Sequence, residues 1–109
     1  MKIKTLALCL ACASLSAAAH AAWPERPVRL VIPYTPGGSV DTLARLVADE
    51  MGRNLSQPII VENKPGASGI VASQHVARAA PDGYTLLFHA SSQVSLPLVD
   101  ANAKYDALK

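Results

Sequence analysis

The chain has 109 residues, of which half are hydrophobic, and it carries ten Lys and Arg residues, eight Asp and Glu residues and two cysteines. Two of the basic residues, Lys2 and Lys4, belong to an amino-terminal leader, so the rest of the chain has a formal net charge of zero. This balance, without a clustered basic face, excludes nucleic acid as the expected partner, and the length allows one small core but not two lobes.

The leader has the three parts of a secretory signal peptide. A basic start is followed by an apolar run over residues 5–19 and by the small-x-small sequence Ala19-His20-Ala21. The apolar run is shorter than the roughly 20 residues that cross a bilayer. We therefore expect residues 1–21 to be removed and residues 22–109 to be periplasmic; an uncleaved membrane anchor is the alternative. Both cysteines fall in the leader, so the mature chain is expected to contain no disulfide.

The first strand and helix surround a short glycine loop. Residues 28–33 form an apolar run bounded by prolines, which predicts a buried strand. The loop at residues 34–38 (Tyr-Thr-Pro-Gly-Gly) follows, and a helix is predicted from Ser39, which we expect to be its N-cap, with Asp41 in the first turn. Apolar residues recur at helical spacing, and the predicted core-facing stripe consists of Val40, Leu43, Ala44, Val47, Met51 and Leu55.

The rest of the chain repeats the order of strand, loop and helix. The expected elements are a strand at 59–61, a loop at 63–69, a helix at about 69–80, a turn at 81–83, a strand at 84–88, a loop at 89–92 and a short helix at 92–96, before Pro97. This order predicts an α/β fold with a parallel βαβαβ sheet. Loops at the carboxyl ends of parallel strands meet at one edge, where open α/β sheets bind ligands.

The glycine loop that opens the first helix predicts an anion site. Free backbone N–H groups at a helix amino terminus, with the helix dipole behind them, bind a carboxylate or a phosphate. Gly37, Gly38 and Ser39 are the candidate donors, and a tight turn with an ordinary cap is the alternative. Asp41 would repel an anion, so it is interpreted as a first-turn residue or loop clamp; contact with an amino or hydroxyl group of a ligand is the alternative.

Other chemistries have little support in the sequence. Arg45 is expected to pair with Asp41 or Asp49 rather than to bind an anion. No nucleophile elbow or phosphate-binding loop occurs, and His89, which could donate to a carboxylate, has no metal-ligand spacing around it, so no catalytic residue, metal or cofactor is expected. A nucleotide- or phosphate-binding α/β enzyme fragment is the rival class, with Glu62 as the ribose-binding acid.

Four segments resemble signatures of one known family, the tripartite tricarboxylate transporter receptors, also called the Bug family of periplasmic solute-binding proteins. The segments are residues 23–28 (WPERPV), 33–45 (PYTPGGSVDTLAR), 61–67 (VENKPGA) and 77–87 (ARAAPDGYTLL). The resemblance extends over residues 23–109 and implies a type II periplasmic-binding-protein lobe. Members of that family are considerably longer and have two lobes, so it also implies that residues 22–109 are a partial amino-terminal lobe.

The resemblance implies a function and a set of ligand contacts. It implies a receptor that closes two lobes on a small carboxylate (a di- or tricarboxylate, an aromatic acid or an acidic amino acid) and delivers it to membrane permease subunits, as a monomer and without enzymatic activity. The expected ligand-binding residues are Tyr34, Thr35, Gly37, Gly38, Ser39, Asp41, Gly66, Ala67, Ala90 and Ser91. Alone, this chain is expected to bind carboxylates weakly or not at all; a truncated remnant without function is the alternative.

The chain departs from the family pattern at four positions. Ser68 and Ala72 stand where the family usually has glycine, Ile70 stands where it has asparagine, and His89 stands where small residues are common. The second loop is therefore expected to be stiffer than in the family.

Overall fold

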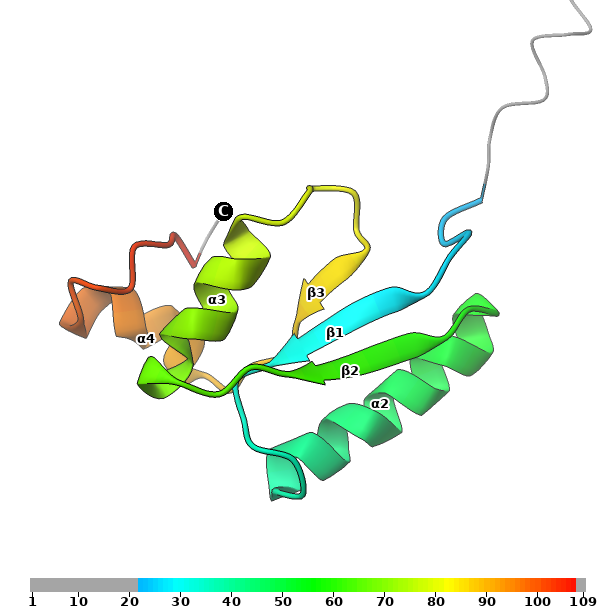
Figure 1. The fold of residues 1–109 in the computed structure, drawn as a ribbon, viewed down its shortest axis with the longest axis horizontal. Helices are drawn as coiled ribbons and strands as arrows, with labels where there is room; N and C mark the ends of the chain where they lie inside the picture. The colour runs from blue at the N-terminus through cyan, green and yellow to red at the C-terminus, as the bar shows by residue number, and fades with distance from the viewer. Residues whose placement is uncertain (1–21, 108–109) are drawn as a thin grey trace, which may run out of the picture.

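The computed structural model describes residues 22–107, so the predicted signal peptide lies outside the described residues. Within them, strands alternate with helices (Figure 1). The elements are β1 (Val28–Ile32), α2 (Ser39–Leu55), β2 (Ile59–Asn63), the 3-10 turn η2 (Ala67–Gly69), α3 (Ile70–Ala77), β3 (Thr85–Leu87) and α4 (Ser92–Val99). The strands are all parallel, in the order β2-β1-β3. This arrangement confirms the predicted α/β fold with a parallel βαβαβ sheet.

The face of the sheet that α2 covers is apolar. Leu30 and Ile32 of β1 pack there against Ala44 and Ala48 of α2, and all four are buried. Partly buried side chains from the neighbouring segments complete this core: Tyr34, Ile59, Val61, Leu86 and Phe88. Ile32 is fully buried, which for a side chain of this size is worth about 2–3 kcal/mol relative to exposure. The α2 face is therefore the main hydrophobic core of the described residues.

The buried face of α2 matches the predicted stripe in part. Its buried residues are Asp41, Ala44 and Ala48, of which Ala44 was predicted. The other predicted residues are half-buried, except for Leu43, which is 52% exposed. The small side chains of the two alanines let this side of the helix lie close to the sheet. Leu43 therefore lies on the side of α2 that faces away from the sheet. The buried position of Asp41, at 3% exposure, is explained by its polar partners, which belong to the site described below.

Helix α4 continues past the proline at which we predicted that it would end. It extends to Val99 with Pro97 inside it. Pro97 has no N–H to donate to the carbonyl of Gln93, four residues earlier. The hydroxyl of Tyr105 donates to that carbonyl instead, over 3.1 Å. A long-range contact therefore replaces the hydrogen bond that the proline removes.

Helix α3 and strand β3 are shorter than predicted. The helix ends at Ala77 rather than near residue 80, and beyond it the Ala79 N–H donates three residues back, to the Val76 carbonyl, instead of four. The strand comprises only Thr85–Leu87. None of the helices within residues 22–107 is long and apolar enough to cross a membrane.

The segment before β1 is fixed to the turn that precedes β3. The N–H of Glu25 donates to the hydroxyl of Tyr84 over 2.9 Å, and the Arg26 guanidinium lies 3.9 Å from the centre of the Tyr84 ring. Arg26 also pairs with Asp82 at 3.2 Å, and the Trp23 ring lies beside that of Tyr84. These contacts hold the start of the folded chain at the amino ends of the strands.

Candidate functional site

Three loops leave the carboxyl ends of β1, β2 and β3 and lie at one edge of the sheet, which we call the crest (Figure 1). The crest consists of residues 33–38, 64–69 and 88–91. The ten predicted ligand-binding residues lie in these loops or in the first turn of α2. Eight of them are exposed: Thr35, Gly37, Gly38, Ser39, Gly66, Ala67, Ala90 and Ser91. Tyr34 is half-buried and Asp41 is buried.

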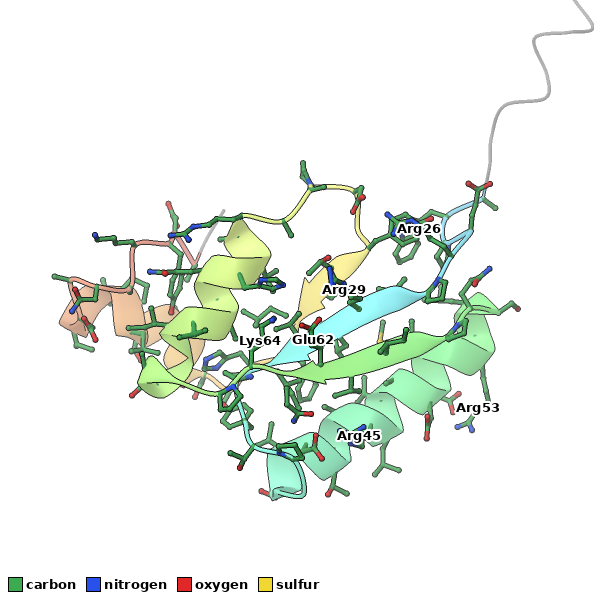
Figure 2. All side chains as sticks on the ribbon, viewed as in Figure 1. Arg26, Arg29, Arg45, Arg53, Glu62 and Lys64 are labelled. Carbon is green, nitrogen blue, oxygen red and sulfur yellow. The ribbon has the colours of Figure 1, made fainter. Side chains whose placement is uncertain are left out.

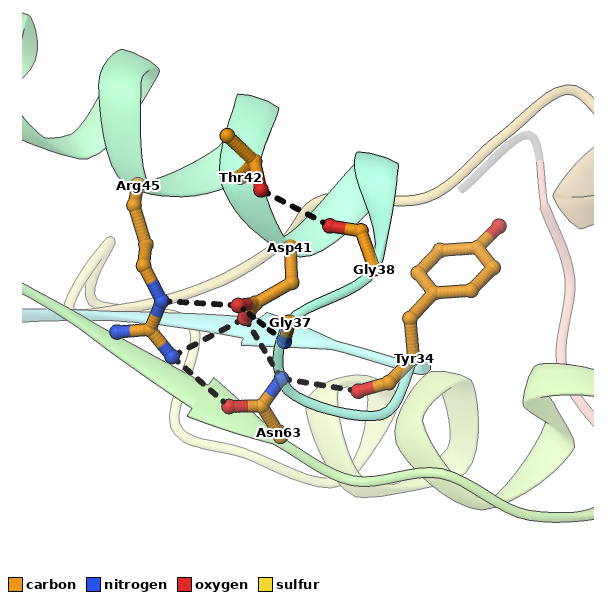
Figure 3. Close-up of polar contacts among 7 residues, drawn as sticks. All are labelled: Tyr34, Gly37, Gly38, Asp41, Thr42, Arg45 and Asn63. Carbon is orange, nitrogen blue, oxygen red and sulfur yellow. Dashed lines mark hydrogen bonds and ion pairs between the residues drawn. The ribbon is translucent and has the colours of Figure 1, made fainter.

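A buried carboxylate fixes the first loop (Figure 3). Oδ2 of Asp41 accepts from the Gly37 N–H over 2.9 Å and from Arg45 Nε over 3.0 Å. Its Oδ1 accepts from Arg45 Nη2 over 3.0 Å and from Asn63 Nδ2 over 2.9 Å. Each oxygen thus accepts two hydrogen bonds, which fills the acceptor sites of a carboxylate. Asp41 therefore acts as the loop clamp that the sequence suggested, and Arg45 pairs with it as predicted.

The same contacts set the charge of Asp41. The hydrogen bonds from Arg45, and after them those from Gly37 and Asn63, hold the pKa of this carboxyl far below its usual range, although burial opposes them. The Arg45 pKa is raised in turn by the hydrogen bond to Asp41. Both groups are therefore ionised at neutral pH, and the two charges cancel at the base of α2.

Asn63 joins the first loop to β2 and was not identified from the sequence. Its Nδ2 donates to the backbone oxygen of Tyr34 over 2.9 Å as well as to Asp41, and its Oδ1 accepts from Arg45 Nη2 over 3.2 Å. Asn63 is the last residue of β2 and lies opposite Ile32 in the parallel register. The sequence did contain a signal for this role: Asn63 directly follows the predicted second strand, and its side chain can therefore reach the loop that follows the first strand.

The amino terminus of α2 lies at the crest. Gly38 is the N-cap, and Ser39, which we predicted in that place, is the first helical residue. As a glycine it has no side chain that could accept from the amides of the first turn, and its carbonyl accepts from the Thr42 hydroxyl over 3.1 Å (Figure 3). The Gly37 N–H is already donated to Asp41, which narrows the candidate anion donors to the amides of Gly38 and Ser39. Gly37 has a φ of +88°, so its role here is to shape the turn.

The second and third loops meet at His89. Its ring lies edge-on to that of Tyr34, with the ring centres 5.7 Å apart. Nδ1 of His89 is 3.5 Å from the Tyr34 hydroxyl and 3.1 Å from the Ala90 oxygen, and the Ala90 N–H donates to the Tyr34 hydroxyl over 3.2 Å. On its other side the imidazole lies against Gly69, where an added Cβ would collide with Nε2. His89 therefore fills the space between all three crest loops.

The second loop has an unusual backbone. Gly66 and Gly69 have positive φ angles of +137° and +97°. Ala67 and Ser68 between them also have positive φ, at 44° and 55°, a region that costs L residues free energy. Ser68, which stands where the family usually has glycine, is thus held in a conformation that glycine would adopt more easily.

The crest is an open surface in this chain. Two grooves, of about 850 and 340 Å³, occur elsewhere among the described residues, and none of the ten predicted residues lines either of them. Within residues 22–107, no cluster of His, Cys, Asp and Glu has the composition of a metal site. The amino terminus of α2 is thus exposed at the crest, beside the Asp41–Arg45 pair, whose charges balance.

These features define an α/β protein with a parallel three-stranded sheet, and comparison with known proteins places it in a family. The sequence profile described as "Tripartite tricarboxylate transporter family receptor" matches residues 43–109. The chain belongs to this family of solute-binding receptors. It is 46% identical over 105 residues to a UPF0065 protein of Bordetella bronchiseptica, covering 95% of this chain and 31% of that protein. It is 43% identical to protein BugT of Bordetella pertussis over 70 residues, 64% of this chain and 22% of BugT.

Solved structures agree with this assignment. The periplasmic binding protein BugD superposes with a TM-score of 0.74 at 40% identity, over 78% of this chain and 28% of that one. MatC from Rhodopseudomonas palustris with bound malate superposes with a TM-score of 0.73 at 41% identity, over 80% of this chain and 30% of MatC. Another R. palustris protein, with adipate, superposes with a TM-score of 0.59 at 42% identity, over 61% of this chain and 22% of that one. The chain thus spans less than a third of the length of these relatives.

Proposed function

We propose that this chain supplies one side of a carboxylate-binding site of an exported solute receptor, and that the crest forms that side. The observation that carries the proposal is the likeness to a malate-bound structure at 41% identity, together with the position of the α2 amino terminus at the crest. Malate and adipate are both small dicarboxylates, so a ligand of that class is the one we assign to this chain.

The crest can attract an anion although no cationic side chain is free to contact that anion. Arg45 is occupied by Asp41, so the attraction comes from the helix dipole and from the amides of Gly38 and Ser39. Because the Asp41 charge is compensated by Arg45, it does not cancel that dipole. Clamping of Gly37 keeps the amides in place before a ligand arrives, which reduces the entropy lost on binding.

The remaining parts of the proposal follow from the family. We assign the chain to the periplasm by way of the leader at residues 1–21, and we assign its partners as a small carboxylate and the permease of a tripartite transporter. We expect a monomer that binds without turnover, with the rest of the pocket on a second lobe.

Two experiments test the proposal. In the first, the chain is titrated with malate and adipate and followed by NMR; the amides of Gly38, Ser39, Gly66 and Ala67 are expected to shift, weakly and without saturation at low concentration. In the second, residues 22–107 replace the matching stretch of MatC, and calorimetry measures binding of malate, the ligand bound in the MatC structure.

Gly38→Pro, which removes one candidate amide, is expected to weaken binding in the chimaera, while Arg53→Ala on the far part of α2 leaves it unchanged. Binding that is lost in the chimaera although it folds, or that is indifferent to Gly38→Pro, would contradict the proposed site.

A further inference from the structure

The side of the sheet that α3 occupies is only partly covered. This helix packs over β1 and β3. It lies beside Arg29 and Ile60, which alternate along the strands with Leu30 and Val61 of the α2 core and therefore face the other side of the sheet. Beside it lies an open groove of about 850 Å³, which we call the basic groove. Its floor is aliphatic, since Ile60 of β2 and Val71 of α3 line it and are 51% and 48% exposed. Parallel sheets of α/β proteins are normally covered by helices on both faces, so an exposed apolar floor beside a single helix marks a surface that lacks its second helix.

The walls of the basic groove are cationic. Three arginines and one histidine line it, against a single acid, Asp82. These basic residues are Arg26, Arg29, His75 and Arg78. Figure 2 shows Arg26 and Arg29 along the open face of the sheet, with Glu62 and Lys64 beyond them near α3.

The charges on this face are only partly balanced inside the chain. Arg26 pairs with Asp82 at 3.2 Å, but Arg29 reaches Glu62 only at 3.5 Å, and Glu62 is shared with Lys64 at 2.8 Å. The hydrogen bond from Lys64 is the main cause that lowers the pKa of Glu62. Arg78, at the carboxyl end of α3, forms no ion pair with any residue in the range 22–107 and is exposed. The groove thus combines an apolar floor with an excess of positive charge.

We propose that the basic groove docks an acidic amphipathic helix, whose apolar side covers Ile60 and Val71 and whose carboxylates pair with Arg29 and Arg78. A helix is the element that lies across a parallel sheet beside another helix, and its acidic side chains follow from the cationic walls. The relatives are more than three times as long as the stretch that matches this chain, so further polypeptide exists in them to supply such a helix. The proposal concerns a face of the sheet, not the crest, and is independent of the carboxylate ligand.

The test uses the full chain and two synthetic helical peptides. One consists of Glu, Ala and Leu with the leucines on one side, and the other has Lys in place of every Glu. Binding is followed by NMR and by the fluorescence of Trp23, the single tryptophan, whose ring lies beside Tyr84 at the end of the groove. The acidic peptide is expected to bind saturably and to shift the amides of Ile60 and Val71, and the basic peptide is expected not to bind.

Charge reversal provides the matched variants. Arg29→Glu with Arg78→Glu is expected to weaken binding of the acidic peptide by about tenfold or more, and Arg78→Glu alone by less, because each replaces a charge pair at the rim of the interface with a repulsion between carboxylates. Arg53→Glu reverses an exposed charge on α2 and is expected to leave the affinity unchanged. Circular dichroism identifies a variant that does not fold, in which case the single Arg78 variant decides.

Three results would overturn the inference. The first is that the acidic and basic peptides bind with equal affinity. The second is that Arg53→Glu weakens binding of the acidic peptide as much as the Arg29 and Arg78 variants do. The third is that the chain associates with itself and the acidic peptide does not displace the second copy. The last would make a second copy of the chain the occupant of the groove.

Discussion

The imidazole of His89 and the backbone of Gly69 fill adjoining space at the crest, so that no side chain larger than a hydrogen fits at position 69. The two residues belong to different loops and are 20 positions apart in the sequence. Because His89 also contacts Tyr34, this packing fixes the relative positions of all three crest loops.

Gly69→Ala is expected to destabilise the fold by at least about 2 kcal/mol, since it adds a collision with His89 to the cost of a φ of +97°. Urea unfolding measures the change. His89→Ala in the same chain is expected to recover only part of it, because the backbone strain remains. Gly38→Ala is the control: its φ of −78° suits alanine, and the nearest atom to an added Cβ, the Thr35 backbone oxygen, is 3.7 Å away. Full recovery in the double variant would show that strain at Gly69 contributes nothing.

Asp41→Asn is expected to lower the midpoint of thermal unfolding at neutral pH and to make that midpoint less dependent on pH in the acid range. The pKa of Asp41 is lower in the folded than in the unfolded chain, so the unfolded chain binds more protons in acid. The stabilisation is therefore fully present above about pH 4, the ordinary range of aspartate, and is lost as the pH falls through the lower folded pKa. Thermal melts from pH 7 to acid compare the two proteins, with Asp49→Asn as the control. Parallel curves for all three would contradict the clamp.

Tyr105→Phe is expected to cost about 1 kcal/mol, because it leaves the Gln93 carbonyl without the hydroxyl that replaces the missing amide of Pro97. The cost should be smaller when Pro97→Ala is also present, since alanine restores an N–H to that carbonyl. A double-mutant cycle on unfolding free energies measures this coupling. Independent, additive effects of the two changes would show that the hydroxyl does not compensate for the proline.

Ser68→Gly is expected to raise the unfolding free energy by up to about 1 kcal/mol, since a left-handed backbone costs serine roughly 1–2 kcal/mol and glycine loses part of that gain to its greater unfolded entropy. Ser95→Gly, at an exposed position in α4, is the control and is expected to lower the unfolding free energy by a similar amount, because glycine is unfavourable within a helix. If both substitutions destabilise alike, the loop backbone around Ser68 is not strained.

The strands, the glycine loops and the start of α2 could be predicted because each has a local cause. Prolines and glycines bound the apolar runs, and the period of the apolar residues changes where a strand gives way to a helix. The pairing of Asp41 with Arg45 was equally accessible, since residues four apart share one face of a helix.

The missed features all depend on contacts between distant residues. Asn63 reaches the first loop only because β2 lies beside β1 in a particular register. The Tyr105 hydroxyl extends α4 through Pro97 from outside the helix, and His89 supports a loop 20 positions away. Local spacing does not encode such contacts, and Leu43 was misplaced for the same reason: the two alanines decide which side of α2 approaches the sheet.

The attachment of Glu25 and Arg26 to Tyr84 has a practical consequence for handling this protein. It anchors the start of the folded chain at the amino ends of the strands, whereas the crest lies at their carboxyl ends. A purification tag, a fluorescent label or a surface-immobilisation linker placed just ahead of Ala22 would therefore project from the opposite end of the sheet and leave the crest loops open to solutes.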